Sequence, residues 1–116
     1  MQSDYDYETA EAMDKSTITS IVTFLKSELQ QKGINLNGIA LFGSQLMGTS
    51  SHDSDIDLII VSDQFRNKNI FERADITMDV EIKALKKFRI PMDILKMTNK
   101  EYTQSLDNKQ FYAQMV

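Results

Sequence analysis

The sequence predicts a single α/β domain in which a small sheet of about three strands is flanked by helices. Three short apolar runs, at 39–42, 56–61 and 92–97, are bounded by turn residues, as is typical of strands. Segments with apolar residues at helical spacing lie before the first run, between the second and third, and after the third. The length of 116 residues is that of one ordinary domain.

The composition narrows the class of protein further. The chain has no cysteine, which excludes a disulfide framework and a zinc–thiolate site. No apolar run approaches the roughly 20 residues of a membrane span, and the N-terminus is acidic where a signal peptide is basic. These features predict a cytoplasmic protein with no membrane partner.

The chain divides into an acidic N-terminal arm, residues 1–14, and a domain over residues 15–116. The arm offers Tyr5 and Tyr7 as its only bulky side chains, too little apolar surface to offset the cost of ordering it. The domain opens with an amphipathic helix that has Asp14 or Ser16 as its N-cap and Gly33 at its end. Its apolar positions are Ile18, Ile21, Val22, Leu25 and Leu29.

Turn residues before Gly38 introduce the first strand, 39–42, and a polar loop leads to the second, 56–61. A long helix follows, and its apolar stripe consists of Phe71, Ala74, Met78, Ile82, Leu85 and Phe88. Pro91 precedes the third strand, 92–97, and Thr98 to Glu101 form a capping box that opens a last helix. The tail, 108–116, is compatible with a short helix, a strand or an exposed patch for a partner.

Two carboxylates at the start of the second strand point to chemistry. Asp55 and Asp57 are two residues apart, so their side chains leave an extended chain on the same face. Like charges beside an apolar strand are costly unless a cation neutralises them, and hard divalent cations bind carboxylate oxygens. Upstream, Gly43 allows a close backbone approach to an anion, and Ser44 adds a hydroxyl donor. Together these residues suggest a site for a metal-bound nucleoside triphosphate.

Three other interpretations of this stretch are open. The D-x-D-x-D spacing of Asp53, Asp55 and Asp57 fits a calcium loop, but Leu58 and Gln64 replace its turn glycine and its bidentate glutamate. The spacing of Gly43 and Gly48 fits a P-loop, but Thr49 replaces its lysine. A solvated acidic turn without a ligand explains the loop, but not the carboxylates that continue into an apolar strand.

The combination of Gly43-Ser44, ten residues, and Asp55-x-Asp57 resembles the G-S-x10-D-x-D signature of the DNA polymerase β-like nucleotidyltransferase superfamily. The run from Phe42 to Leu58 is most similar to the minimal, MNT-type domains. The resemblance implies a polymerase β-like fold with a small mixed sheet. It also implies a third carboxylate on the neighbouring strand, which Asp93 matches, so that Asp55, Asp57 and Asp93 would be the catalytic and metal-binding residues. The implied nucleotide-binding residues are Gly43, Ser44, Thr49 and Ser54.

The resemblance implies a nucleotidyltransferase that uses two Mg²⁺ ions. Such an enzyme would transfer a nucleoside monophosphate, here AMP from ATP, to a hydroxyl group. The chain is too short to include the second domain that usually shapes an acceptor pocket, so we expect the acceptor to be supplied by a partner. The resemblance to MNT-type domains implies that this partner is a HEPN-type toxin, for which this chain would be the antitoxin. The net charge of −4 fits a small nucleotide better than long nucleic acid. His52, the only histidine, receives no role.

Two alternatives to this function are open. One is transfer to a small molecule such as an aminoglycoside. The other is an antitoxin with little or no activity that acts by binding alone. The second is favoured by Gln45 and Met47, which stand where many members of the superfamily have basic or aromatic residues.

Overall fold

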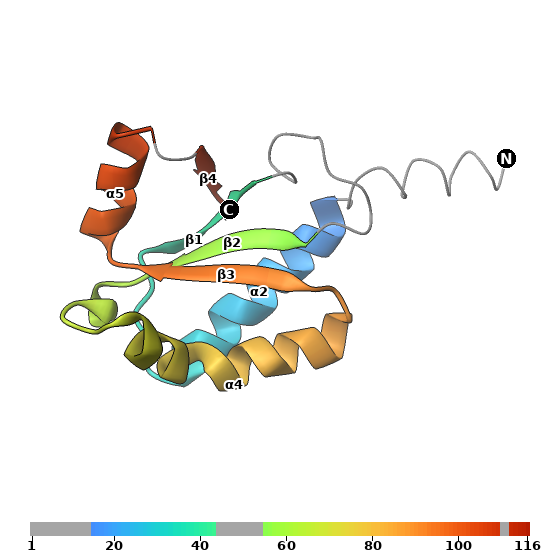
Figure 1. The fold of residues 1–116 in the computed structure, drawn as a ribbon. Helices are drawn as coiled ribbons and strands as arrows, with labels where there is room; N and C mark the ends of the chain where they lie inside the picture. Colours follow the sequence, from blue (N-terminus) through green and yellow to red (C-terminus); the bar gives the residue numbers. More distant parts are fainter. Residues whose placement is uncertain (1–14, 44–54, 110–111) are drawn as a thin grey trace, which may run out of the picture.

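The computed structural model describes residues 15–43, 55–109 and 112–116, which form helices around a four-stranded sheet (Figure 1). The elements are α2 (Lys15–Gln31), β1 (Gly38–Phe42), β2 (Ile56–Val61), the 3-10 turn η1 (Asp63–Phe65), α4 (Ile70–Phe88), β3 (Met92–Met97), α5 (Asn99–Asp107) and β4 (Ala113–Met115). The predicted α/β class is therefore confirmed. Among the helices of these described ranges, none combines the length and the hydropathy needed to cross a bilayer.

The strands follow the order β3-β2-β1-β4. β2 and β3 are parallel, whereas β1 pairs antiparallel with both β2 and β4. The sheet is thus mixed, as the resemblance implies, and it has one strand more than the three expected. The additional strand is β4, which forms part of the tail and pairs with β1 from Ala40↔Met115 to Phe42↔Ala113.

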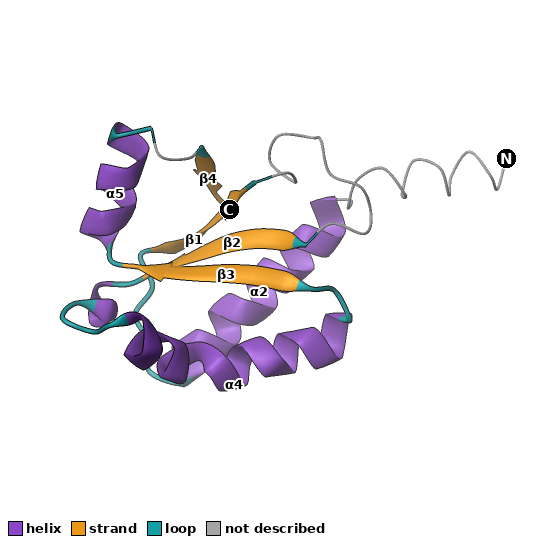
Figure 2. Ribbon diagram, in the orientation of Figure 1, coloured by secondary structure: helices purple, strands orange, loops and turns teal. Residues whose placement is uncertain are grey.

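The main core lies on the face of the sheet that α2 and α4 cover (Figure 2). β2 contributes Ile56, Leu58 and Ile60 to this core, and all three are fully buried. Its alternate residues Ile59 and Val61 are buried on the opposite face in a smaller cluster with residues of β1, β4 and α5. β2 is therefore apolar on both faces because both are covered, except at Asp57, which is half-buried.

The first helix agrees with its predicted pattern. Ile21, Val22, Leu25 and Leu29 are the buried residues of α2. Beyond the helix the chain turns at Gly33, which has a φ of 86°. A positive φ is unfavourable for residues that carry a Cβ, so glycine is suited to end the helix here.

The long helix α4 differs from the prediction in the face that it buries. Its buried residues are Thr77, Val80 and Ala84, on the side opposite most of the predicted stripe. Within that stripe Phe71, Met78, Ile82 and Leu85 are exposed, while Ala74 and Phe88 are partly buried. The helix begins after a capping box formed by Asn69 and Glu72, which was not predicted from the sequence.

An ion pair joins α4 to α5. The capping box of Thr98 and Glu101 opens α5 as predicted, and the Glu101 carboxylate also accepts hydrogen bonds from Arg73 Nη1 at 2.7 Å and Nη2 at 3.1 Å. The Arg73 guanidinium is largely buried and also donates to the carbonyl oxygens of Lys68 and Lys96. The Arg73 hydrogen bonds lower the pKa of Glu101 below its usual value of 4.5.

This ion pair predicts a pH-dependent contribution to stability. A carboxylate whose pKa is lower in the folded chain than in the unfolded chain stabilises the folded state. This stabilisation is complete at pH values above the unfolded pKa, and it is lost as the pH falls through the folded pKa. We expect Glu101→Gln, which keeps the capping box, to lower the free energy of unfolding by about 1 kcal/mol near neutral pH, since the pair is partly exposed. Urea unfolding at a series of pH values tests this: the difference from the wild type should shrink as pH falls below 4.5, and a constant difference would contradict it.

Candidate active site

Two of the predicted carboxylates lie side by side on neighbouring strands. The parallel register of β2 and β3 pairs Asp57 directly with Asp93. Ile56, next to Asp57, and Ile94, next to Asp93, belong to the main core. Successive side chains of a strand point to opposite faces of the sheet, so both aspartates lie on the face away from that core. Asp57 is half-buried and Asp93 is exposed. Because neighbouring strands are about 4.8 Å apart, two carboxylates in this arrangement can reach one cation.

Asp55, the third predicted carboxylate, directly precedes β2 and is exposed. It lies two residues before Asp57, and continued alternation would direct it to the same face as Asp57. Within the described residues, no three Asp, Glu, His or Cys side chains come close enough to one another to hold a metal ion. The three-carboxylate metal site therefore stays a prediction.

The glycine corner at the end of β1 lies against Asp57. Phe42 is the register partner of Asp57, and Gly43 follows it with a φ of 76°. A Cβ atom on Gly43 would lie 2.9 Å from Asp57 Cγ and closer still to the carboxylate oxygen Oδ2. The backbone at this position can approach the Asp57 side chain only because the residue is glycine. Gly43 and Asp57, which 13 residues separate in the sequence, are thus brought into contact.

Other predicted site residues lie outside the described ranges. They are Ser44, Thr49 and Ser54, which we expect to bind phosphate, together with Gln45, Met47 and His52. The acidic arm, residues 1–14, is outside these ranges as well. The assignment of phosphate contacts to this loop stays a prediction, and of its expected members only Gly43 is placed.

The acidic pair lies at the end of the sheet away from α5. Asp57 and Asp93 occur at the beginnings of β2 and β3, whereas the α5 residue Tyr102 packs with Ile59 and Val61 farther along β2. In Figure 2 the beginnings of these strands and the helix α5 occupy opposite ends of the sheet. Among the described helices, α5 is the one that packs on this face, and it does so at Ile59 and Val61 rather than at the two aspartates.

The chemistry of the donor set fits magnesium. Mg²⁺ prefers oxygen ligands and is usually bound by one or two carboxylates together with phosphate oxygens of a substrate. Asp57 and Asp93 supply two carboxylates on one face, and Asp55 supplies another within two residues of the first. The register between β2 and β3, and the contact of Gly43 with Asp57, were not apparent from the sequence, because neither arises from a local pattern.

Comparisons with known proteins identify the family of the chain. Residues 23–110 match the family described as Polymerase beta, Nucleotidyltransferase. The chain therefore belongs to the polymerase beta nucleotidyltransferase family, and it is a nucleotidyltransferase. No curated protein matches the chain significantly.

Two solved structures are similar to this fold. One is a candidate nucleotidyltransferase from Sulfolobus solfataricus, with a TM-score of 0.54 and 24% sequence identity over 88% of this chain and 86% of that chain. The other is described as a toxin-antitoxin with AMP-PNP, with a TM-score of 0.42 and 23% identity over 62% of this chain and 54% of that chain. The first likeness supports the assignment of the fold.

Proposed function

We propose that this nucleotidyltransferase transfers AMP from ATP to a hydroxyl group, with magnesium held by Asp55, Asp57 and Asp93. The observation that carries the proposal is the direct pairing of Asp57 with Asp93, together with the contact of Gly43 against Asp57. This arrangement combines carboxylates for a cation with a glycine corner suited to phosphate. These two features suit phosphoryl chemistry, in which catalysis is mostly positioning and charge stabilisation.

In the proposed mechanism, the backbone at Gly43 and the hydroxyl of Ser44 hold the β- and γ-phosphates of ATP. The acceptor oxygen forms a bond to the α-phosphorus, the bond from that phosphorus to the bridging oxygen breaks, and pyrophosphate leaves. We assign to Asp93, whose side chain is exposed, the role of the general base that takes the proton of the acceptor hydroxyl. Magnesium, when bound, supplies charge stabilisation to the triphosphate and lowers the pKa of the attacking hydroxyl.

For the acceptor, we propose a hydroxyl on a protein partner, a tyrosine of a HEPN-type toxin. The similarity of the signature to the minimal MNT-type domains supports this choice. Asp93 is exposed, as an acidic residue that meets a macromolecular acceptor needs to be. A contact-only antitoxin is the second candidate, because Gln45 and Met47 replace residues that commonly support triphosphate binding in the superfamily.

Calorimetry and mass spectrometry test this proposal. We expect ATP to bind measurably with Mg²⁺ and far more weakly in EDTA, because the phosphates and the carboxylates repel each other without a cation. We also expect mass spectrometry of the purified pair, incubated with ATP and Mg²⁺, to show AMP on a partner tyrosine. ATP binding that is insensitive to Mg²⁺ would contradict the metal site. A partner without added AMP would contradict the proposed acceptor.

A further inference from the structure

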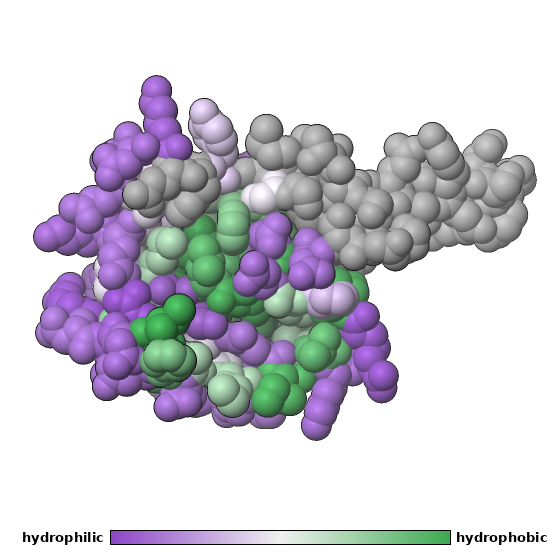
Figure 3. Space-filling model, viewed as in Figure 1, coloured by the Kyte–Doolittle hydropathy of each residue, from purple (hydrophilic) through white to green (hydrophobic). Residues whose placement is uncertain are grey.

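The helix α4 has a second apolar face that the fold leaves exposed. Phe71, Met78, Ile82 and Leu85, here called the α4 stripe, are 77%, 50%, 45% and 49% exposed. Val80 and Ala84 of the same helix are buried in the main core. At 3.6 residues per turn the stripe lies on the side of the helix opposite Val80. Figure 3 shows hydrophobic side chains gathered over α4 on the lower side of the molecule.

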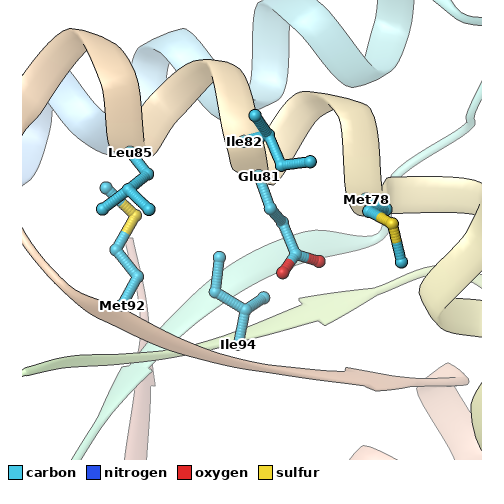
Figure 4. A pocket seen from close by; sticks show the side chains of 6 residues that line it. All are labelled: Met78, Glu81, Ile82, Leu85, Met92 and Ile94. Atoms are coloured by element: carbon cyan, nitrogen blue, oxygen red, sulfur yellow. The ribbon is translucent and has the colours of Figure 1, made fainter.

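A shallow groove runs beside this stripe. Met78, Ile82 and Leu85 form its α4 wall, and Met92 and Ile94 of β3 form the other (Figure 4). Of the described residues that line it, only Glu81 is charged, and its carboxylate is already engaged. Glu81 Oε2 accepts hydrogen bonds from Lys96 Nζ at 3.0 Å and from Thr77 Oγ1 at 2.6 Å. The groove therefore presents an apolar surface of the kind that marks an interface.

The charges beside the stripe have opposite signs toward its two ends. Asp75 lies in the first half of α4 and Lys86 in its last turn, and both are exposed. They are 11 residues apart, which is close to three helical turns, so both flank the stripe on the same side. In the described part of the chain neither side chain forms an ion pair with another residue.

We propose that the α4 stripe binds the α4 stripe of a second copy of this chain, with the two helices antiparallel across a two-fold axis that crosses the interface midway between Met78 and Ile82. This arrangement sets Met78 of each copy opposite Ile82 of the other, and Asp75 of each beside Lys86 of the other. A two-fold interface must be self-complementary, and the order of charges along α4 meets this requirement. The spacing of Phe71, Met78 and Leu85 is the seven-residue repeat with which paired helices pack.

A test begins with the wild-type chain. The interface centres on one helix from each copy and is therefore small, so we expect a dimer with a dissociation constant of about 10–100 µM by sedimentation equilibrium. The samples contain no nucleotide, so the result does not depend on the proposed function. A chain that is monomeric at about 1 mM would overturn the proposal, whether or not the stripe then binds another protein.

Substitutions on the stripe test its position. Met78→Glu with Ile82→Glu should abolish the dimer without unfolding the chain, because both side chains are already half exposed. Tyr112→Glu, at a residue that is 69% exposed before β4, is the matched control and should leave the dimer intact. Circular dichroism melting curves confirm that each variant is folded. A dimer that persists in the stripe variant would overturn the proposal.

Charge reversals test the antiparallel orientation. Asp75→Lys and Lys86→Asp should each raise the dissociation constant about tenfold or more, since each places like charges together twice in the dimer. The double variant Asp75→Lys/Lys86→Asp restores opposite charges and should return the constant close to that of the wild type. A double variant as weak as either single variant would overturn the arrangement.

Discussion

Replacing Asp57 with asparagine should reduce the rate of nucleotidyl transfer about a thousandfold or more while leaving the chain folded. Asparagine has the shape of aspartate but lacks its charge, and a catalytic metal contributes several kcal/mol to the stabilisation of a transition state. Asp57 is the central member of the proposed site, because it is paired with Asp93 and contacts Gly43. The measurement is the initial rate of AMP incorporation into the partner, together with an unfolding curve for the variant.

The control for this prediction is Asp107→Asn. Asp107 is exposed in the last turn of α5, so its replacement removes the same charge away from the acidic pair. We expect the control variant to keep the wild-type rate. A folded Asp57→Asn variant with an undiminished rate would show that the acidic pair does not bind the catalytic metal.

A double variant separates catalysis from contact. If the proposed partner is a toxin and transfer of AMP is required, Asp55→Asn with Asp57→Asn should abolish its neutralisation. If contact suffices, neutralisation will survive in the same variant although incorporation of AMP is lost. The second result would favour the binding-only antitoxin that Gln45 and Met47 suggest.

Much of the fold could be predicted because its local patterns agree with its tertiary contacts. The residues of β2 are apolar in nearly every position because both faces of the strand are buried. α2 has one apolar stripe, and that stripe is the buried one. The capping box at Thr98 depends on residues three apart and was therefore visible in the sequence.

The buried face of α4, which the sequence pattern misassigned, and the strand β4, which it left undecided, depend on information that is not local. α4 has apolar residues on two sides, and periodicity alone does not tell which side meets the sheet; the core side includes Thr77 and Arg73. β4 has only three residues, and it is a strand because β1 pairs with it, so no pattern within Ala113–Met115 identifies it.

The candidate site was predictable as a set of residues but not as an arrangement. The spacing of Asp55 and Asp57, and the resemblance that singled out Asp93, named the carboxylates. The pairing of Asp57 with Asp93 depends on strand register, which is set by how the whole of β3 packs beside β2. The contact of Gly43 with Asp57 depends likewise on the antiparallel pairing of Phe42 with Asp57.

That contact leads to the second large effect, which we expect from Gly43→Ala. The φ of 76° at Gly43 is unfavourable for alanine, and the added Cβ would overlap with the Asp57 carboxylate. The strain should lower the free energy of unfolding by about 1–2 kcal/mol. Because the Asp57 side chain or the end of β1 must shift to make room, the rate of transfer should also fall, by about a hundredfold.

Gly33→Ala separates backbone strain from displacement of the carboxylate. Gly33 has a φ of 86°, similar to that of Gly43, but a Cβ on Gly33 would have no atom within 4 Å. We therefore expect the two variants to lose comparable stability from backbone strain, while only Gly43→Ala loses activity. Parallel urea unfolding curves and initial rates measure both quantities. If the two variants keep equal activity, the position of Asp57 against the glycine corner has no role in transfer, and the phosphates must be held elsewhere.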